Sequence, residues 1–199
     1  FMVKCGLVDN PTVSQYRLTA HLLAAFLIYS YMLWVALSLL YPSDSDRSHA
    51  WYGKSVLLTA LITLTVVSGG FVAGLKAGKI YNTFPMMGNY WVPPDVMALD
   101  PWWRNLFENM ATVQLDHRVL AITTLLLIVL FWWRIPKQDL PGRARKGVNA
   151  LLHTGILQVV LGIVTLLMSV PIALGAAHQG VAMLLFTVSL FLVHALRRA

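Results

Sequence analysis

Five apolar stretches dominate the chain and leave few other ways for it to fold. They cover residues 18–41, 55–75, 108–133, 148–170 and 175–196. A bilayer core of about 30 Å is crossed by about 20 helical residues at 1.5 Å each. Backbone groups in lipid must be satisfied within their own segment, and continuous apolar runs favour helices over alternating barrel strands. The sequence therefore predicts an all-α polytopic membrane bundle of five transmembrane helices, the last four closing into one four-helix bundle.

Composition and charge exclude several other classes. The 199 residues are 58% hydrophobic and only 12% charged, about half the charge density of a soluble domain, and this apolar content also excludes disorder. The single cysteine, Cys5, excludes an internal disulfide. The net charge is +7, but the basic residues lie in short connections between apolar runs, so we expect no nucleic-acid partner.

Lysine and arginine also predict the orientation. Nine of them lie in 42–54, 134–147 and the C-terminal tail, against five in the N-terminal segment and the long connection around 76–105. By the positive-inside rule the nine-residue side faces the cytoplasm or the mitochondrial matrix. This puts the N-terminus of the chain outside and its C-terminus inside.

Histidines are the ionisable residues of the apolar stretches, which contain no Asp, Glu, Lys or Arg beyond the first turns of the third. Proton pumps and transporters of charged substrates usually carry such charges, so both functions are disfavoured. At 1.5 Å per residue, His21, His117 and His178 lie roughly 24–30 Å from the inner helix ends, whereas His153 and His194 lie near the inner side.

Three imidazoles at one depth favour haem, because bis-histidine ligation needs two rings at the same height. Zinc would need a third or fourth ligand, and a histidine bonded to a neighbouring backbone group is the structural alternative for each case. Gly70, Gly74 and Gly78 form a smooth stripe that suits close helix packing or a planar cofactor. The outer cations Lys76, Lys79, Arg104 and Arg118 are candidates for haem propionates, although a solvated or lipid-phosphate role is favoured for each.

Several motifs resemble those of the haem A synthases. They are GFVAGLKAGKIYNTFPMMG at 70–88, ENMATVQLDHR at 108–118 and LGAAHQG at 174–180, with MVKCGL at 2–7 and YRLTAHL at 16–22. The last two resemble the proteobacterial and mitochondrial branch. The resemblance covers nearly the whole chain.

This resemblance implies an eight-helix oxidoreductase of two four-helix bundles, which oxidises a methyl group of haem O to a formyl group for terminal oxidases. Residues 55–199 would be the C-terminal bundle, binding a haem b cofactor through His117 and His178 and relaying electrons. Residues 1–54 would be an outer segment plus one helix of the substrate bundle, with His21 binding the iron of the substrate haem.

Three helices are expected before Phe1, on this chain or another, one of them carrying a Glu-x-x-His-Arg motif. Gln114 takes the glutamate position of that motif here, so the expected catalytic glutamate lies upstream and this stretch alone is incomplete for turnover.

The implied location is the bacterial inner or mitochondrial inner membrane. The expected partners are the bilayer, haem O, haem O synthase, terminal-oxidase assembly factors and a second copy of the chain. Two alternatives stay open. One is a non-enzymatic cytochrome b subunit with bis-histidine ligation. The other, less favoured, is a haem transporter using the inner-side residues Asn149, His153 and Gln158.

Overall fold

The computed structural model describes residues 14–42 and 48–197. Five helices in these ranges are long and apolar enough to cross a membrane: α1 (Gln15–Leu40), α2 (Tyr52–Gly74), α4 (Met110–Arg134), α5 (Gly142–Leu167) and α6 (Ile172–Arg197). Short helices lie in the connections: η1 (Ala77–Lys79), η2 (Trp102–Arg104), α3 (Asn105–Glu108) and η3 (Lys137–Asp139). The predicted all-α membrane bundle is confirmed.

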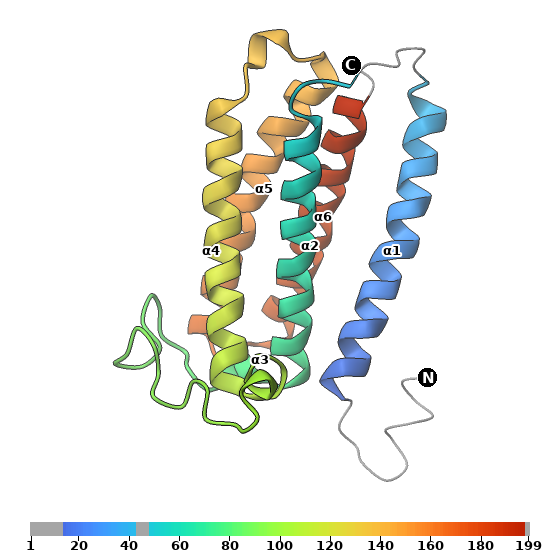
Figure 1. The fold of residues 1–199 in the computed structure, drawn as a ribbon. Helices are drawn as coiled ribbons and strands as arrows, with labels where there is room; N and C mark the ends of the chain where they lie inside the picture. Colours follow the sequence, from blue (N-terminus) through green and yellow to red (C-terminus); the bar gives the residue numbers. More distant parts are fainter. Residues whose placement is uncertain (1–13, 43–47, 198–199) are drawn as a thin grey trace.

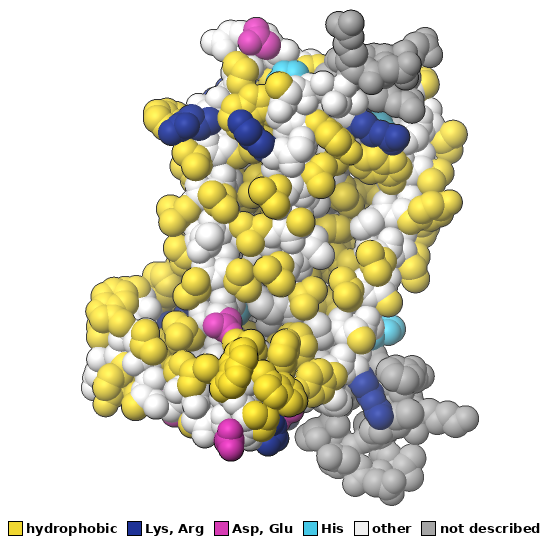
Figure 2. Space-filling view, viewed as in Figure 1, with side chains coloured by type: hydrophobic (Ala, Val, Ile, Leu, Met, Phe, Trp, Pro, Cys, Tyr) yellow, Lys and Arg dark blue, Asp and Glu magenta, His cyan; other side chains and the backbone are white. Residues whose placement is uncertain are grey.

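Four of the long helices close into a ring. Helices α2 and α4, α4 and α5, α5 and α6, and α6 and α2 are in contact, and α1 packs outside the ring against α2 and α6 (Figure 1). On the face drawn in Figure 2, hydrophobic side chains cover the middle of the molecule, and Lys and Arg lie toward its two ends. This banding is what a lipid-facing surface requires.

The apolar core fills the half of the bundle in which α4 and α6 end. Its most deeply buried side chains come from all four helices of the ring: Ile62, Ile128, Val148, Leu151, Leu192 and Leu196. The opposite half holds buried polar side chains instead, among them Asn105, Asn109 and Gln114. Buried polar groups need hydrogen-bond partners, so this second half is where a polar site belongs.

The third apolar stretch begins with a break that the sequence did not predict. We expected a helix from residue 108, but α3 ends at Glu108 and α4 starts at Met110. Asn109 between them is extended, and its side-chain oxygen accepts hydrogen bonds from the backbone N–H groups of Ala111 and Thr112. It is therefore the N-cap of α4, a position that asparagine favours.

Pro171 lies immediately before α6. The preceding helix α5 already ends at Leu167, and Ser169 and Val170 adopt left-handed φ values of 60° and 59°. The carbonyl of Pro171 accepts from the Gly175 N–H, the first turn of α6. Proline fits a helix start because its missing N–H is not needed there.

Helix α1 meets α2 most closely at two glycines of the sequence stripe. A Cβ at Gly74 would lie 2.6 Å from Cα of Gln15, and one at Gly70 would lie 2.9 Å from Oγ1 of Thr19. Gly78, the third member, faces a side-chain methyl of Val170 instead, at 3.0 Å. The stripe therefore serves helix packing, one of the two interpretations that the sequence allowed.

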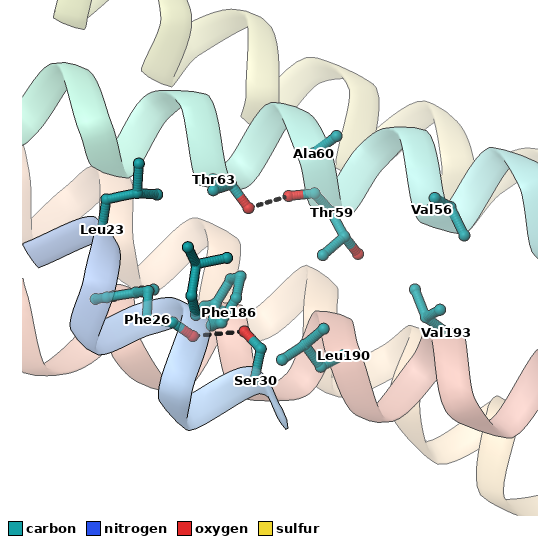
Figure 3. A pocket seen from close by; sticks show the side chains of 11 residues that line it. Leu23, Phe26, Ser30, Val56, Thr59, Ala60, Thr63, Phe186, Leu190 and Val193 are labelled. Carbon is teal, nitrogen blue, oxygen red and sulfur yellow. Dashed lines mark hydrogen bonds between the residues drawn. The ribbon is translucent and has the colours of Figure 1, made fainter. Parts of the chain in front are cut away.

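Further along, α1 separates from the ring and leaves an apolar groove of about 290 Å³. Figure 3 shows its walls, formed by α1 (Leu23, Phe26, Ser30), α2 (Val56, Thr59, Ala60, Thr63) and α6 (Phe186, Leu190, Val193). The hydroxyls of Ser30, Thr59 and Thr63 donate to carbonyls of their own helices. The groove is therefore apolar in effect and offers no group for chemistry.

A polar cluster fastens α1 to the connection before α4. Arg104 donates two hydrogen bonds to one carboxylate oxygen of Glu108, at 2.6 and 2.9 Å, and the Tyr16 hydroxyl donates to the other at 2.9 Å. These bonds, those from Arg104 foremost, hold the pKa of Glu108 below its ordinary 4.5. The carboxylate is thus charged at neutral pH and joins two segments distant in the sequence.

We expect Gly74→Ala to destabilise the protein by about 1–3 kcal/mol, the usual cost of overpacking. The new methyl group would meet a backbone atom of Gln15, which no side-chain rotation can relieve. Denaturant titration in detergent measures the effect. Gly53→Ala is the control, because a Cβ there meets nothing within 4 Å. Equal stability of the two variants would contradict the close α1–α2 contact.

Glu108→Gln should lower the melting temperature slightly, and only where the carboxylate is charged. Because the folded pKa of Glu108 is lowered, its contribution is complete above the ordinary pKa and is lost as the pH falls through the folded value. The difference from wild type should be constant above the ordinary pKa of 4.5 and should shrink as the pH falls further below it. Asp139→Asn, at the opposite end of the bundle, controls for general charge effects. A difference independent of pH would show that the carboxylate charge is irrelevant.

Candidate functional site

His117 lies on α4, and its imidazole points at α2, where it contacts a glycine and a serine. A Cβ at Gly69 would lie 3.1 Å from Cε1 of the ring, so only glycine leaves full room. The adjacent Ser68 has its hydroxyl oxygen 2.8 Å from Nδ1 of His117. That hydroxyl donates to the carbonyl of Thr65 at 2.7 Å, so it accepts from Nδ1–H. The Nε2 lone pair is thereby left to act as a ligand.

His178 lies on α6 and is received by α5 in the same way. A Cβ at Gly162 would lie 2.8 Å from Cε1 of its ring. Gln158 lies four residues before Gly162 on α5, and its side-chain nitrogen is 3.3 Å from Nε2 of His178. Nδ1 of His178 and Oε1 of Gln158 are buried and have no hydrogen-bond partner. Such orphaned polar atoms are costly inside an apolar bundle and often mark a functional site.

The two imidazoles interact electrostatically. Each is held by a helix pair of the same plan, α2 with α4 and α5 with α6, in which a glycine of the first helix faces the histidine of the second. Among the described residues, no three His, Cys, Asp or Glu side chains form a group that could hold a metal ion. Two imidazoles are fewer than the three or four protein ligands of a zinc site.

His21 does not join this pair. Thr19 and Leu22 reach toward Gly70 of α2, and Phe26 is buried, which defines the inward face of α1. His21 is exposed and falls on another side of the helix, because successive residues are about 100° apart. The structure therefore brings His117 and His178 together, and the role of His21 stays a prediction.

The inner-side polar residues are engaged locally. Nδ1 of His153 lies 2.7 Å from the backbone oxygen of Asn149, and the Asn149 side chain accepts from Trp132. His194 lies beside Ser38, with Nε2 3.3 Å from its hydroxyl. Gln158 is roughly 13 Å further along α5 from Asn149, at 1.5 Å per residue, and pairs with His178. These residues therefore do not form the inner-side group that the transporter alternative needs.

The outer connection is tied to the histidine end of α4. Gln114 donates to the Tyr81 carbonyl at 3.1 Å, and Arg118 donates to the same carbonyl at 2.8 Å and to that of Thr83 at 2.9 Å. Asn82 reaches the Leu166 carbonyl near the end of α5. Two of the four cations considered for propionates, Arg104 and Arg118, are thus engaged with protein groups. Gln114 has a structural role in holding this connection.

Sequence reasoning did not predict that Gly69 faces His117, that Gly162 faces His178 or that Ser68 contacts the first of these rings. The four-residue period of the glycine stripe drew attention to Gly70, Gly74 and Gly78, which face α1 and Val170. We call each arrangement of a glycine that faces a histidine ring on the next helix a glycine cradle. The signal that would have identified the two cradles is a glycine in the helix that precedes each histidine-bearing helix. Its significance depends on which helix faces meet, and this is a property of the tertiary structure.

Taken together, the fold and the site define a polytopic helical membrane protein whose ring of four helices contains two histidines, each facing a glycine of a neighbouring helix. Comparison with known proteins then places it more closely. The family model COX15-CtaA, described as cytochrome oxidase assembly protein, matches residues 1–190. The chain belongs to this family, as its motifs predicted.

Relatives from bacteria and mitochondrial lineages agree. Heme A synthase of Nitrosospira multiformis is 51% identical over 202 residues, covering 100% of this chain and 57% of the relative. Heme A synthase COX15 of Arabidopsis thaliana and of Homo sapiens are 44% and 43% identical, covering 100% of this chain and 46% and 51% of theirs. The chain thus spans about half the length of the curated relatives it matches. No solved structure matches it.

We expect Gly162→Ala to displace the imidazole of His178 and to destabilise the protein by about 1–3 kcal/mol. Gly69→Ala should cost less, because its Cβ would lie 3.1 Å rather than 2.8 Å from the facing ring carbon. Thermal unfolding of the purified protein measures both. Gly180→Ala is the matched control, since it lies near His178 on α6 and a Cβ there meets nothing within 4 Å. If all three variants unfolded alike, the cradles would have no special role.

Proposed function

We propose that this chain is the cofactor-binding part of a membrane haem A synthase, an oxidoreductase that converts a methyl group of haem O into a formyl group. The observation that carries the proposal is the pair of glycine-cradled imidazoles in one half of a four-helix ring. Membership of the family supports it, because relatives covering the whole chain are named heme A synthase.

The cofactor that we propose for this pair is haem b, whose iron would supply one-electron redox chemistry. His117 and His178 would hold it as axial ligands from α4 and α6. Ser68 fixes the ring of His117 by accepting its Nδ1 proton, and the glycines keep the space beside each ring clear. The apolar core beyond the site keeps water away from it and lowers the local dielectric constant.

The substrate haem O would bind on the other side of α1, where His21 is exposed. Tyr31 and Met32 are also exposed on α1, so this helix presents apolar surface away from the ring. The relatives named heme A synthase are about twice as long as this chain. We propose that a catalytic glutamate and a second substrate-side histidine lie in sequence preceding Phe1, and that residues 1–54 belong with that bundle and 55–199 with the cofactor.

The protein is a multi-pass membrane protein. We propose that its membrane is the bacterial inner or the mitochondrial inner membrane, with the Arg- and Lys-rich connection after α4 on the cytoplasmic or matrix side. Helix α1 then begins outside and α6 ends inside. Haem O synthase, terminal-oxidase assembly factors and a second copy of the chain are the protein partners that this role would involve.

The runner-up is a non-enzymatic cytochrome b subunit, which the same pair of histidines would serve equally well. The two functions differ in one cellular product. A strain deleted for the whole gene should lose haem A and accumulate haem O if the protein is the synthase, and should retain haem A if it is only an electron carrier. Pigment extraction and chromatography of the haems measure this directly.

Replacement of His117 or His178 by alanine should abolish the low-spin b-type absorbance of the purified, reduced protein. Each change removes one of two axial ligands, which the bundle cannot replace. His153→Ala is the matched control, because that histidine is also in a membrane helix but is bonded to its own backbone. A normal bis-histidine spectrum in either His117→Ala or His178→Ala would refute the ligand assignment, and a colourless wild-type protein would favour transport.

A further inference from the structure

We propose that Ser68 is a positioning residue for the haem iron: by accepting the Nδ1 proton of His117 it makes the two axial imidazoles unequal and lowers the reduction potential of the centre. This inference rests on the proposed haem site and extends it to a residue that touches a ligand, not the iron.

The first step concerns the direction of the hydrogen bond. Ser68 has one hydroxyl proton, and it is directed to the Thr65 carbonyl at 2.7 Å. The contact of 2.8 Å with Nδ1 of His117 must therefore be one in which the ring donates and the serine oxygen accepts. The ring is held in the tautomer with its proton on Nδ1. A histidine that ligates a metal through Nε2 usually donates its other ring proton in this way.

The second step is that no side-chain hydroxyl accepts from the ring on the other side. Nδ1 of His178 is buried and has no hydrogen-bond partner. The two helix pairs share one register, since Gly69 faces His117 as Gly162 faces His178. Ser68 precedes Gly69, and the residue that precedes Gly162 is Leu161. A side chain that cannot accept a proton thus stands where the first pair has its serine.

The third step is the electronic consequence. Donation of the Nδ1 proton raises the electron density on the ligating nitrogen and makes the imidazole a stronger ligand. A stronger basic ligand stabilises ferric over ferrous iron, and hydrogen bonding of axial ligands is one of the means by which proteins set haem potentials. His117 is therefore the strong ligand of the pair and His178 the weak one, and the Ser68 bond shifts the potential downward.

The position of Ser68 is itself supported by a second bond between the same helices. The hydroxyls of Thr65 on α2 and Thr124 on α4 lie 2.8 Å apart, one turn further along the bundle. This bond fixes the register of α2 against α4 without contacting His117. It supplies a control variant that loosens the same helix pair but leaves the ligand bond in place.

The test uses the full-length protein purified with its haem, in four variants, with potentiometric titration of the haem spectrum and electron paramagnetic resonance of the ferric form. Ser68→Ala should raise the potential and shift the g values, and Ser68→Thr, which keeps a hydroxyl, should restore both. Leu161→Ser should lower the potential by giving His178 the acceptor that it lacks. Thr124→Val, which removes the same Thr65–Thr124 bond from the α4 side, should reduce stability but leave the potential unchanged.

Each outcome decides the matter. If the wild type shows no bis-histidine haem, the proposed function itself fails. If the haem and both ligands persist but Ser68→Ala and Leu161→Ser leave the potential where Thr124→Val leaves it, the function stands and this inference is overturned. If Ser68→Ala loses its haem, Leu161→Ser decides alone: a lower potential supports the inference and an unchanged one refutes it.

Discussion

The contact between glycine and imidazole is the constraint on which this bundle depends. A histidine ring must enter the space between two helices that otherwise pack with apolar side chains, and a Cβ on the facing helix would collide with it at 2.8 or 3.1 Å. Glycine in a membrane helix costs little, because neighbouring helices and the apolar surroundings keep the backbone bonded. In each helix pair a glycine and a histidine take the place of two apolar side chains. These two substitutions create space for polar groups in one half of the ring, while the other half remains a conventional apolar core.

The division of the ring into two halves also explains how the ends are built. Buried Asn105 and Asn109 bond to each other, and through Leu99 and Asp95 they hold the long connection beneath the bundle. Gln114 and Arg118 continue this network to Tyr81. Polar groups that would be costly in a membrane core are thus concentrated at one end, where each can find a backbone partner. The opposite end has a mainly apolar core, and its polar contacts, such as that of Trp132 with Asn149, are local pairs.

Much of this architecture could be predicted from the sequence. The features that could not be predicted depend on side-chain caps and on which helix faces meet. The five spans follow from apolar length alone, since lipid leaves no other option. The pairing of His117 with His178 is a prediction from the family motifs, because depth alone also placed His21 beside them. By contrast, the break at Asn109 depends on a side-chain cap, and the role of Gly69 depends on which face of α2 meets α4. Periodicity identified Gly70, Gly74 and Gly78 because a period is visible in one helix, whereas a cradle exists only between two.

Helix α1 shows how one segment can meet two sets of requirements. Its inward face is set by Thr19 and Phe26, and it is fastened by the Tyr16 bond to Glu108. Its other faces are apolar and carry exposed His21. A helix with a single partner would need only one conserved contact surface, and lipid would satisfy the remainder without an imidazole. Since an unpaired imidazole in lipid costs free energy, His21 is best explained by a ligand or a helix on the side of α1 that faces away from the ring. On this argument α1 would be a shared wall: the proposed cofactor site and the proposed substrate site would lie on its two sides, and any change that tilts α1 at Gly74 should affect both.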